Sequence, residues 1–408
     1  MKKKSLILLI LFILMGNQGI HPQSKTVNLP VIDLSKTYPK KEKNLRDIAT
    51  LEYIPLETSN DVLLGEKSVL SAVTDNYILI HDWDRGDIFV FSRAGKIVSH
   101  FNHKGQSGRE YVSISGVSSN SIGTILDEKN EEIFVCSYSI QVYSLSGEYK
   151  RTLPINTILN NSKVFNFDDE TLLLFDSFNF DPASSRTSYK TNPYSLISKK
   201  DGSQIAVLDI YLPKRYSNKM NQKLENGKMW ASMIMFPSNM CYGQDFVIAD
   251  MSSDTLYLLT QNRKLTPLLT RKPSVHASSD PLIVWTTLLT TDKFILYSKI
   301  PIKLAYAGSS EGGGGGQSPN YMYEFETGEI SDMTILDSDV IRNMNRSWKR
   351  DWGPGQSPAI AKNMTAQLIW PMYIINAYKA KRLTKDMEKF AKTLDEDDNP
   401  VVRIIKFK

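Results

Sequence analysis

One pattern returns five times along this chain: a short apolar run, a polar turn that usually carries glycine, and a second run rich in β-forming residues. The turns centre on Gly95, Gly147, Gly202, Asn262 and Gly328, so successive repeats are 52, 55, 60 and 66 residues apart. A drifting period of this size, filled with short strands and hairpin turns, is typical of the blades of a β-propeller. The repeat therefore predicts an all-β fold.

The apolar runs also fit blades better than they fit a solvent-facing sheet. A blade is covered on both faces by its neighbours, so its inner strands should be continuously apolar instead of alternating. Seven segments have this character: Tyr77–Ile80, Ile88–Phe91, Ile133–Val135, Leu172–Phe175, Phe246–Ala249, Leu256–Leu259 and Phe294–Tyr297.

We expect a single domain, residues 25–408, that forms a six-bladed β-propeller. The sixth blade is expected to combine Ala366–Tyr373, the C-terminal run Val401–Phe407 and the N-terminal run Asp47–Leu56. This joining of the chain ends in one sheet removes the exposed edges that an open ring would leave, and a ring without a free edge favours a monomer. The other five blades are expected at about 66–103, 114–156, 162–211, 232–271 and 283–334.

Thr384–Leu394 breaks the β pattern. Its apolar residues Met387, Phe390, Ala391 and Leu394 follow the i, i+3, i+4, i+7 spacing of an amphipathic helix, which we expect to pack across one mouth or edge of the ring.

Three polar segments without periodicity are expected to be long loops: Asn179–Pro193, Lys214–Met229 and Ser309–Ser318. The last contains five consecutive glycines, Gly312–Gly316. A phosphate-binding loop would need Lys-Ser/Thr after its glycines and a strand-to-helix context, and neither is present.

The N-terminus has the features of an export signal. Lys2–Lys4 supply the positive charge, and Leu6–Met15 is an apolar stretch of about ten residues, too short to span a bilayer. We expect this signal to occupy about residues 1–24, with cleavage between Gly16 and Lys25. Asn17 stands where a lipoprotein signal would need cysteine, which excludes a lipid anchor at that position. The sequence therefore predicts a periplasmic or secreted protein with no transmembrane or lipid anchor.

The charge of the chain gives no reason to expect nucleic-acid binding. The formal net charge is +5, and removing the three lysines of the signal leaves +2. The densest basic stretches, Lys40–Lys43 and Lys379–Lys385, are interrupted by acidic or apolar residues, as expected of a solvated surface.

The chain has two cysteines, Cys136 and Cys241, about two repeats apart. Residues two blades apart rarely approach within the roughly 7 Å between Cα atoms that a disulfide needs. We therefore expect two buried free thiols.

Four segments resemble a known family: Leu29–Tyr38, Leu51–Thr58, Lys104–Tyr111 and Leu394–Lys408. They are similar to the six-bladed β-propeller family of exported Bacteroidetes proteins, which is related in fold to NHL-repeat propellers. That family usually carries a G-x-G-x-G-E-[FY] connector after its first blade, and here Ser107 replaces one glycine of Gly105–Tyr111. The resemblance implies the fold and an exported location, and it implies no established reaction.

His81–Asp87 is the most suggestive segment for a metal ion, because it holds an imidazole and three carboxylates. A calcium loop that starts at Asp82 would place Gly86 at position 5 and Arg93 at position 12, where oxygen ligands are needed. A β-turn explains Asp and Gly equally well. His100 and His103 have no identifiable partners for zinc. We therefore assign no metal and no cofactor.

No catalytic residue stands out. Ser107 misses the G-x-S-x-G spacing of a serine nucleophile by one residue. Paired carboxylates for glycoside chemistry could come from distant strands, and no one pair is distinguished. The acidic candidates are Glu128, Glu131, Glu132, Asp168, Asp169 and Glu170.

Exposed tryptophan beside a cation can stack on a sugar ring or anchor a partner protein. On this basis the candidates for ligand binding are Trp83, Arg85, Arg109, Trp348 and Trp352. Two hypotheses follow. The first, which we favour, is a non-enzymatic binding or scaffold propeller for a glycan, peptide or partner protein. The second is a hydrolase or lyase that acts on a polysaccharide or peptide through carboxylates at the central channel.

Overall fold

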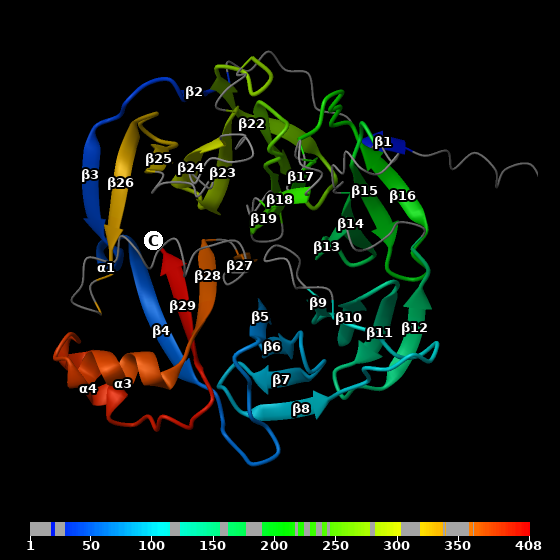
Figure 1. Cartoon of the computed structure of the whole chain (residues 1–408), viewed down its shortest axis with the longest axis vertical. Coiled ribbons are helices and arrows are strands. Elements are labelled where there is room, and N and C mark those ends of the chain that lie inside the picture. The colour runs from blue at the N-terminus through cyan, green and yellow to red at the C-terminus, as the bar shows by residue number, and fades with distance from the viewer. Residues whose placement is uncertain are drawn as a thin grey trace, which may run out of the picture.

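Six antiparallel sheets stand radially around a central axis, each forming one blade of a propeller (Figure 1). The computed structural model describes residues 18–20, 29–114, 123–155, 162–176, 190–216, 219–223, 229–233, 239–242, 245–277, 282–302, 319–337, 339, 359–361 and 363–408. The six-bladed architecture confirms the fold predicted from the repeat.

The first three blades follow the chain, with the innermost strand first. Blade 1 contains β5 (Ser68–Val73), β6 (Tyr77–Asp82), β7 (Ile88–Ser92) and β8 (Ile97–Phe101). Blade 2 contains β9 (Thr124–Asp127), β10 (Glu132–Cys136), β11 (Ile140–Ser144) and β12 (Tyr149–Leu153). Blade 3 contains β13 (Ser162–Asn166), β14 (Thr171–Asp176), β15 (Tyr194–Ser198) and β16 (Gln204–Leu208).

Blades 4 and 5 continue this order. Blade 4 contains β19 (Asn239–Tyr242), β20 (Asp245–Ile248), β21 (Thr255–Leu259) and β22 (Leu265–Lys272). Blade 5 contains β23 (Leu282–Thr290), β24 (Phe294–Ile302), β25 (Asn320–Glu324) and β26 (Ile330–Leu336). Blade 4 begins later than the expected residue 232, because β17 (Lys219–Lys223) and β18 (Met229–Met233) form a separate hairpin. The prediction of a loop over residues 214–229 is therefore wrong for β17 and for the first residue of β18.

Blade 6 joins the two ends of the chain, as predicted. Its strands are β27 (Ala359–Ala361), β28 (Met364–Ile369), β29 (Val401–Phe407) and β4 (Ala49–Pro55). β29 pairs with β4 in seven register positions, from Val401 opposite Pro55 to Phe407 opposite Ala49. The ring is therefore closed by backbone hydrogen bonds between segments about 350 residues apart.

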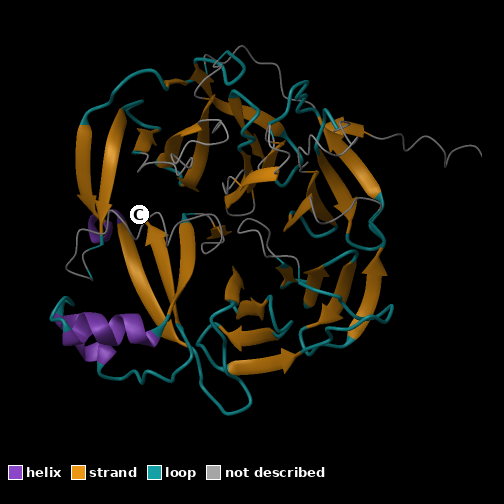
Figure 2. Cartoon of the chain, viewed as in Figure 1, coloured by secondary structure: helices purple, strands orange, loops and turns teal. Residues whose placement is uncertain are grey.

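Two helices lie in the connection between β28 and β29, at the edge of blade 6 (Figure 2). The predicted helix is confirmed as α4 (Lys385–Ala391). The expected strand Ala366–Tyr373 is wrong at its end, because β28 stops at Ile369 and α3 (Pro371–Lys379) follows. Pro371 occupies the first turn of α3, where proline is well tolerated because its missing N–H would have no partner.

Three short strands from the N-terminal region extend blades 3, 4 and 5 on their outer side. β1 (Gln18–Ile20), β2 (Val31–Asp33) and β3 (Lys40–Asn44) pair in parallel with β16, β22 and β26. The sequence analysis did not predict these three strands. For β3 the reason is that Lys40–Asn44 is polar throughout and shows no alternation of apolar and polar residues. In the structure this strand is largely exposed. β1 lies within the segment predicted to be the signal, and the rest of that signal lies outside the described residues. A four-residue helix, α1 (Leu45–Ile48), links β3 to β4.

The core consists of one apolar layer between each pair of neighbouring blades. In β7, Phe89 and Phe91 pack toward blade 6, whereas Ile88 and Val90 pack toward blade 2. Successive side chains of a strand point to opposite faces, and here both faces meet another blade. This explains why the inner strands are continuously apolar.

The free thiol expected at Cys136 is confirmed: its side chain is buried in β10, and burial raises the pKa of the thiol to about 12. The side chain of Cys241 and the glycine run 312–316 lie outside the described residues.

The repeated glycine turn is explained by contact with the preceding blade as well as by backbone conformation. Gly147 has φ +89°, and a Cβ atom there would lie 2.5 Å from Cγ of Phe101, at the end of the outer strand of blade 1. Gly328 has φ +68°, and no atom lies within 4 Å of the same position.

We predict that Gly147→Ala destabilises the protein more than Gly328→Ala. Both substitutions place alanine in left-handed backbone, at a cost of about 1 kcal/mol. Only the first must also displace Phe101, which should add roughly 1–3 kcal/mol. Urea unfolding of both variants measures the difference, and equal losses of unfolding free energy would contradict the packing argument.

Candidate ligand-binding face

Antiparallel pairing sends alternate connections of every blade to opposite ends of the ring. With the strands of a blade lettered A to D from the channel outward, the A–B and C–D connections lie at one end, here called the turn face. The B–C and D–A connections lie at the other end, here called the loop face. Connections of the turn face are two to five residues long, whereas those of the loop face range from 3 to 31 residues. Sequence length beyond the strands is therefore concentrated on the loop face.

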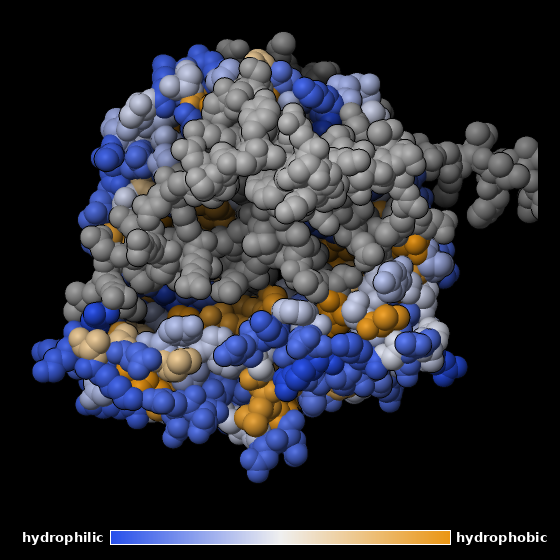
Figure 3. All heavy atoms as spheres, in the orientation of Figure 1, coloured by the Kyte–Doolittle hydropathy of each residue, from blue (hydrophilic) through white to orange (hydrophobic). Residues whose placement is uncertain are grey.

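Exposed apolar side chains follow the same asymmetry. In the described part of the chain, nine large hydrophobic residues are exposed, and none lies in a turn-face connection. Val31, Val98 and Ile205 lie on outer strands. The other six lie in loop-face connections: Leu63, Val112, Tyr138, Tyr211, Met372 and Tyr373. Figure 3 shows apolar surface around the middle of the ring, bordered by hydrophilic residues.

Four exposed or partly exposed side chains lie in loop-face connections that begin or end at blades 1 and 2, and they are here together called the strip. The strip consists of Leu63, Trp83, Val112 and Tyr138. Trp83, in the β6–β7 turn, is partly exposed, and Nζ of Lys67 lies 5.6 Å from the centre of its ring. Partly exposed tryptophan and tyrosine offer flat apolar surface to a ligand with little loss of side-chain entropy.

Hydrogen bonds hold the members of the strip together. The hydroxyl of Tyr111, next to Val112, donates to the carbonyl of Gly86 in the same turn as Trp83 (2.6 Å). The N–H of Ser113 donates to Oγ of Ser137, next to Tyr138 (3.4 Å). The connector Gly105–Tyr111 therefore fixes the position of the strip.

Arg85, predicted as a ligand-binding residue, is engaged within the protein. Its Nε lies 3.1 Å from carboxylate oxygens of both Asp82 and Asp87, and its Nη2 donates to the carbonyl of Leu63 (3.0 Å). Arg85 thus ties the β6–β7 turn to the connection that carries Leu63. Its guanidinium positions the strip.

Asp82 builds the turn that the sequence also allowed as a cation loop. Its Oδ1 accepts hydrogen bonds from the backbone N–H groups of Asp84 and Arg85, and Gly86 has φ +89°. These contacts are those of an Asx-type turn. Among the described residues, no three His, Cys, Asp or Glu side chains gather closely enough to hold a metal ion.

Arg109 contacts blade 2. Its carbonyl accepts a hydrogen bond from the hydroxyl of Tyr143 (2.7 Å), and its guanidinium lies over the ring of Tyr149, 5.6 Å from the centre. Both tyrosines belong to blade 2. The other two predicted residues, Trp348 and Trp352, lie outside the described residues.

The connector motif has a structural explanation. Oε2 of Glu110 accepts a hydrogen bond from the N–H of Ser107 (2.9 Å), which lowers the pKa of Glu110. A Cβ atom at Gly105 would lie 2.0 Å from that same oxygen. Glycine at 105 and glutamate at 110 therefore form one compact loop.

A buried polar cluster joins blades 1 and 2, and the sequence analysis missed it. Nδ1 of His81 lies 2.7 Å from Oγ of Ser71 and 3.1 Å from Oγ1 of Thr124, and the two hydroxyls are 2.6 Å apart. Ser71 and Thr124 come from the innermost strands of neighbouring blades. Because His81 is fully buried, the cluster cannot reach a substrate, and burial lowers the pKa of its imidazole to about 4.

The acidic candidates for glycoside chemistry all lie in A–B connections or at their edge, on the turn face. Glu132 accepts hydrogen bonds from the two terminal nitrogens of the Arg151 guanidinium, Nη1 and Nη2 (2.7 and 2.6 Å). Asp168 pairs with Arg263 of blade 4 (2.9 Å). Contacts of this kind fasten neighbouring strands and blades to each other.

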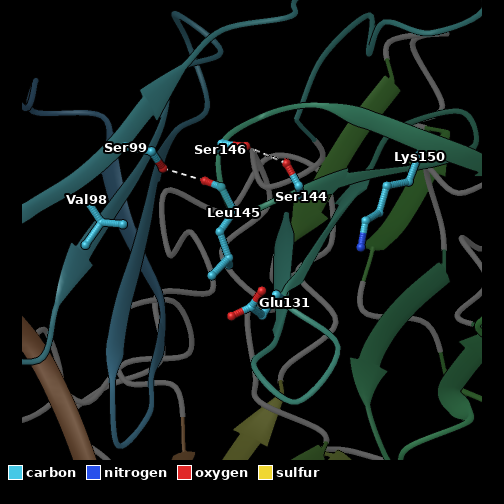
Figure 4. Close-up of a pocket in the computed structure, with 7 residues that line it drawn as sticks. All are labelled: Val98, Ser99, Glu131, Ser144, Leu145, Ser146 and Lys150. Carbon is cyan, nitrogen blue, oxygen red and sulfur yellow. Dashed lines mark hydrogen bonds between the residues drawn. The ribbon is translucent and has the colours of Figure 1, made fainter.

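Glu131 borders a shallow hollow of about 400 Å³ between blades 1 and 2 (Figure 4). The hydroxyls in it are already bonded: Oγ of Ser99 donates to the carbonyl of Leu145 (2.5 Å), and Ser144 bonds Ser146 (2.8 Å). Among the described residues that line the hollow, no second carboxylate accompanies Glu131.

We predict that His81→Asn makes stability less dependent on pH. Between pH 6.5 and about 4, the unfolded chain binds a proton at His81 that the folded protein excludes. The free energy of unfolding of the wild type therefore falls as pH decreases through this window. Asparagine can still accept a hydrogen bond from Ser71 and does not titrate. Urea unfolding at a series of pH values measures this dependence. If the free energy of unfolding falls equally with decreasing pH in the variant and the wild type, the prediction is wrong.

A family model described as a domain of unknown function, DUF4934, matches residues 29–406. Among solved structures, a putative exported protein from Bacteroides fragilis NCTC 9343 superposes with a TM-score of 0.58 at 13% identity, over 93% of this chain and 99% of that one. A member of the DUF4221 family from Bacteroides vulgatus ATCC 8482 gives a TM-score of 0.45 at 12% identity, over 88% and 97%. No curated protein matches the chain. None of the described helices is both long and apolar enough to cross a membrane.

Proposed function

The chain belongs to the DUF4934 family, and we propose that it is an exported, non-enzymatic propeller that binds a glycan, a peptide or a partner protein on its loop face. The observation that carries this proposal is the asymmetry of the two faces. All long connections belong to one face, and so do the exposed large apolar residues outside the outer strands in the described part of the chain. Binding residues are commonly carried by loops on a rigid scaffold, and an exposed apolar patch marks a site of interaction.

The distribution of acids supports binding over hydrolysis. A glycosidase needs two carboxylates about 5–10 Å apart on either side of the scissile bond. The acids singled out in the sequence lie on the turn face, and Glu132 and Asp168 are bound to arginines. On the loop face, Asp82 is bonded to its own turn and to Arg85. These three acids thus serve to hold the scaffold together.

Export is part of the proposal. It is supported by the positive and apolar segments at residues 1–15 and by the similar Bacteroides fragilis protein, which is described as a putative exported protein. In this proposal the propeller domain follows a signal of about residues 1–24.

We predict that the apolar strip contributes to binding. The double variant Trp83→Ala/Tyr138→Ala should weaken the binding of a glycan or peptide found by panel screening at least tenfold, since one aromatic anchor contributes about 1.4 kcal/mol or more. Isothermal titration calorimetry measures the affinity. Ile205→Ala, which truncates an exposed residue on an outer strand, is the matched control and should leave it unchanged. Equal affinities for both variants would contradict a site on the strip.

We also predict that the full-length chain, expressed in a Bacteroides host, leaves the cytoplasm and loses its first residues. Cell fractionation locates the protein, and mass spectrometry of the purified product should place its new N-terminus between residues 17 and 25. A cytoplasmic protein that retains residues 1–15 would overturn the export proposal.

A further inference from the structure

The outer edge of blade 1 lacks the added strand that blades 3, 4 and 5 carry. In those three blades the outer strands β16, β22 and β26 each pair in parallel with a further strand, whereas in the described part of the chain the sheet of blade 1 ends at β8. Figure 1 shows β8 as the outermost strand of its blade. An unpaired edge presents N–H and C=O groups that can pair with another chain. The edge of β8 is therefore a candidate docking surface.

β8 has the same local geometry as two of the edges that are covered. A β-bulge leaves Val98 of β8 without a residue opposite it in β7, and the same irregularity occurs at Ile205 in β16 and at Leu268 in β22. In β16 and β22 the added strand pairs with residues that follow the bulge. The bulge therefore does not prevent parallel addition of a strand. The corresponding pairing segment of β8 is Ser99–Phe101.

The pairing of β2 with β22 indicates which backbone groups of β8 would be used. The N–H of Thr270, two residues after the bulge, donates to the carbonyl of Pro30 (2.9 Å). His100 occupies the corresponding position in β8. Before the bulge the edge is already occupied, because the N–H of Ile97 donates to Oε2 of Glu57 (2.9 Å). The edge of β8 can thus accept a strand from Ser99 onward.

An added strand also places alternate side chains between two blades. In β2 and the residue after it, Ile32 and Leu34 are buried between blades 4 and 5. On β8, the side chain of Ser99 faces blade 2, where its Oγ donates to the carbonyl of Leu145. Directly opposite residues of paired strands point to the same face of a sheet. A side chain opposite Ser99 would therefore point toward the hollow of about 400 Å³ between blades 1 and 2 (Figure 4).

Glu131 gives this hollow its chemical preference. The residue is exposed, and Figure 4 shows its carboxylate beside the side chain of Leu145. No described cation pairs with Glu131, and the one cation that lines the hollow, Lys150, lies 3.1 Å from Oε1 of Glu132. The serine hydroxyls are bonded to other groups of the protein. The hollow therefore offers one unpaired carboxylate, which a lysine or arginine side chain matches.

We propose that the edge of β8 binds an extended segment of a partner protein, which pairs in parallel with Ser99–Phe101 and places a lysine or arginine side chain in the hollow beside Glu131. In strand addition of this kind, backbone hydrogen bonds provide affinity and side-chain pockets provide specificity. The surface lies at the rim of the ring, apart from the loop-face connections. The inference goes beyond the proposed function and does not rest on it.

A set of matched peptides tests the proposal. The probe is a fluorescein-labelled peptide of residues 28–36, which contains β2, with the substitution Pro30→Lys. Position 30 comes directly before Val31, the partner of Thr270, so in the same register it lies opposite Ser99. Control peptides carry norleucine or glutamate at this position.

Fluorescence anisotropy with the full exported chain measures the affinities. The lysine peptide should bind about two- to fivefold more tightly than the norleucine peptide, as expected for an exposed ion pair, and the glutamate peptide should bind more weakly than both. Equal affinities of the three peptides, or no saturable binding of any of them, would overturn the proposal.

Substitution of Glu131 tests the hollow. Glu131→Gln should remove the preference for lysine over norleucine. Glu148→Gln is the matched control, since Glu148 is an exposed glutamate of a neighbouring turn that does not line the hollow, and it should keep the preference. Equal preferences in these two variants would exclude Glu131 as the partner of the cation.

Two substitutions of His100 test the backbone pairing. His100→Pro and His100→Ala both lose the contacts of the imidazole with Asp87 and Phe89, but only proline also removes the N–H. The proline variant should lose peptide binding and the alanine variant should retain it. Equal affinities of these two variants, with folding checked by circular dichroism, would contradict strand addition. Glu131→Gln leaves the strand intact, so the test does not depend on the folding of the proline variant.

The rim site can be separated from the proposed function with the variant of the strip. Trp83→Ala/Tyr138→Ala should bind the lysine peptide as the wild type does, because neither residue contributes to β8 or to the hollow. Loss of peptide binding in this variant would place the peptide on the loop face and would overturn the rim site.

Discussion

The pairing of β4 with β29 is the constraint on which the rest of the structure depends. It holds residues 49–55 against residues 401–407, so that the first and last parts of the propeller form one sheet. Once this sheet exists, every blade has a neighbour on both sides, and an apolar layer can form at each of the six interfaces. Buried Arg403 of β29, paired with Asp337 beyond blade 5, adds a second link across the closure. Without the pairing of β4 with β29, two blades would expose apolar faces to water.

Closure also determines where the chain can vary. Short A–B and C–D connections on the turn face are fastened by ion pairs between blades, such as Arg263 with Asp168, and Lys199 with Asp127. Long insertions there would disturb these contacts. The loop face carries no such restriction on length, and it accommodates the two-helix insertion of blade 6 as well as the connector after blade 1. A rigid side and a variable side are therefore a consequence of the strand order, and the variable side is the natural place for recognition.

The sequence predicted features that depend on local chemistry. The turns at Gly147 and Gly328 have left-handed backbone, and the presence of glycine in the sequence indicates such a turn. The apolar residues of α4 recur with the spacing of an amphipathic helix, so this helix could also be predicted. Features that depend on contacts between blades could not be predicted. α3 was missed because its apolar residues follow directly on a strand, and β3 because its lysines show no alternation.

The candidate site divides in the same way. Trp83 stood out by residue type, whereas the engagement of Arg85 by Asp82, Asp87 and the Leu63 carbonyl is visible only in three dimensions. Trp348 and Trp352 remain predictions from the sequence.

The most direct test of a recognition role for the loop face is a crystal structure of the full exported chain soaked with a mixed pool of acidic and neutral oligosaccharides and peptides. Our account predicts ligand density over the loop-face connections, against the strip of Leu63, Trp83, Val112 and Tyr138. Density confined to the turn face or to the hollow beside Glu131 would contradict it.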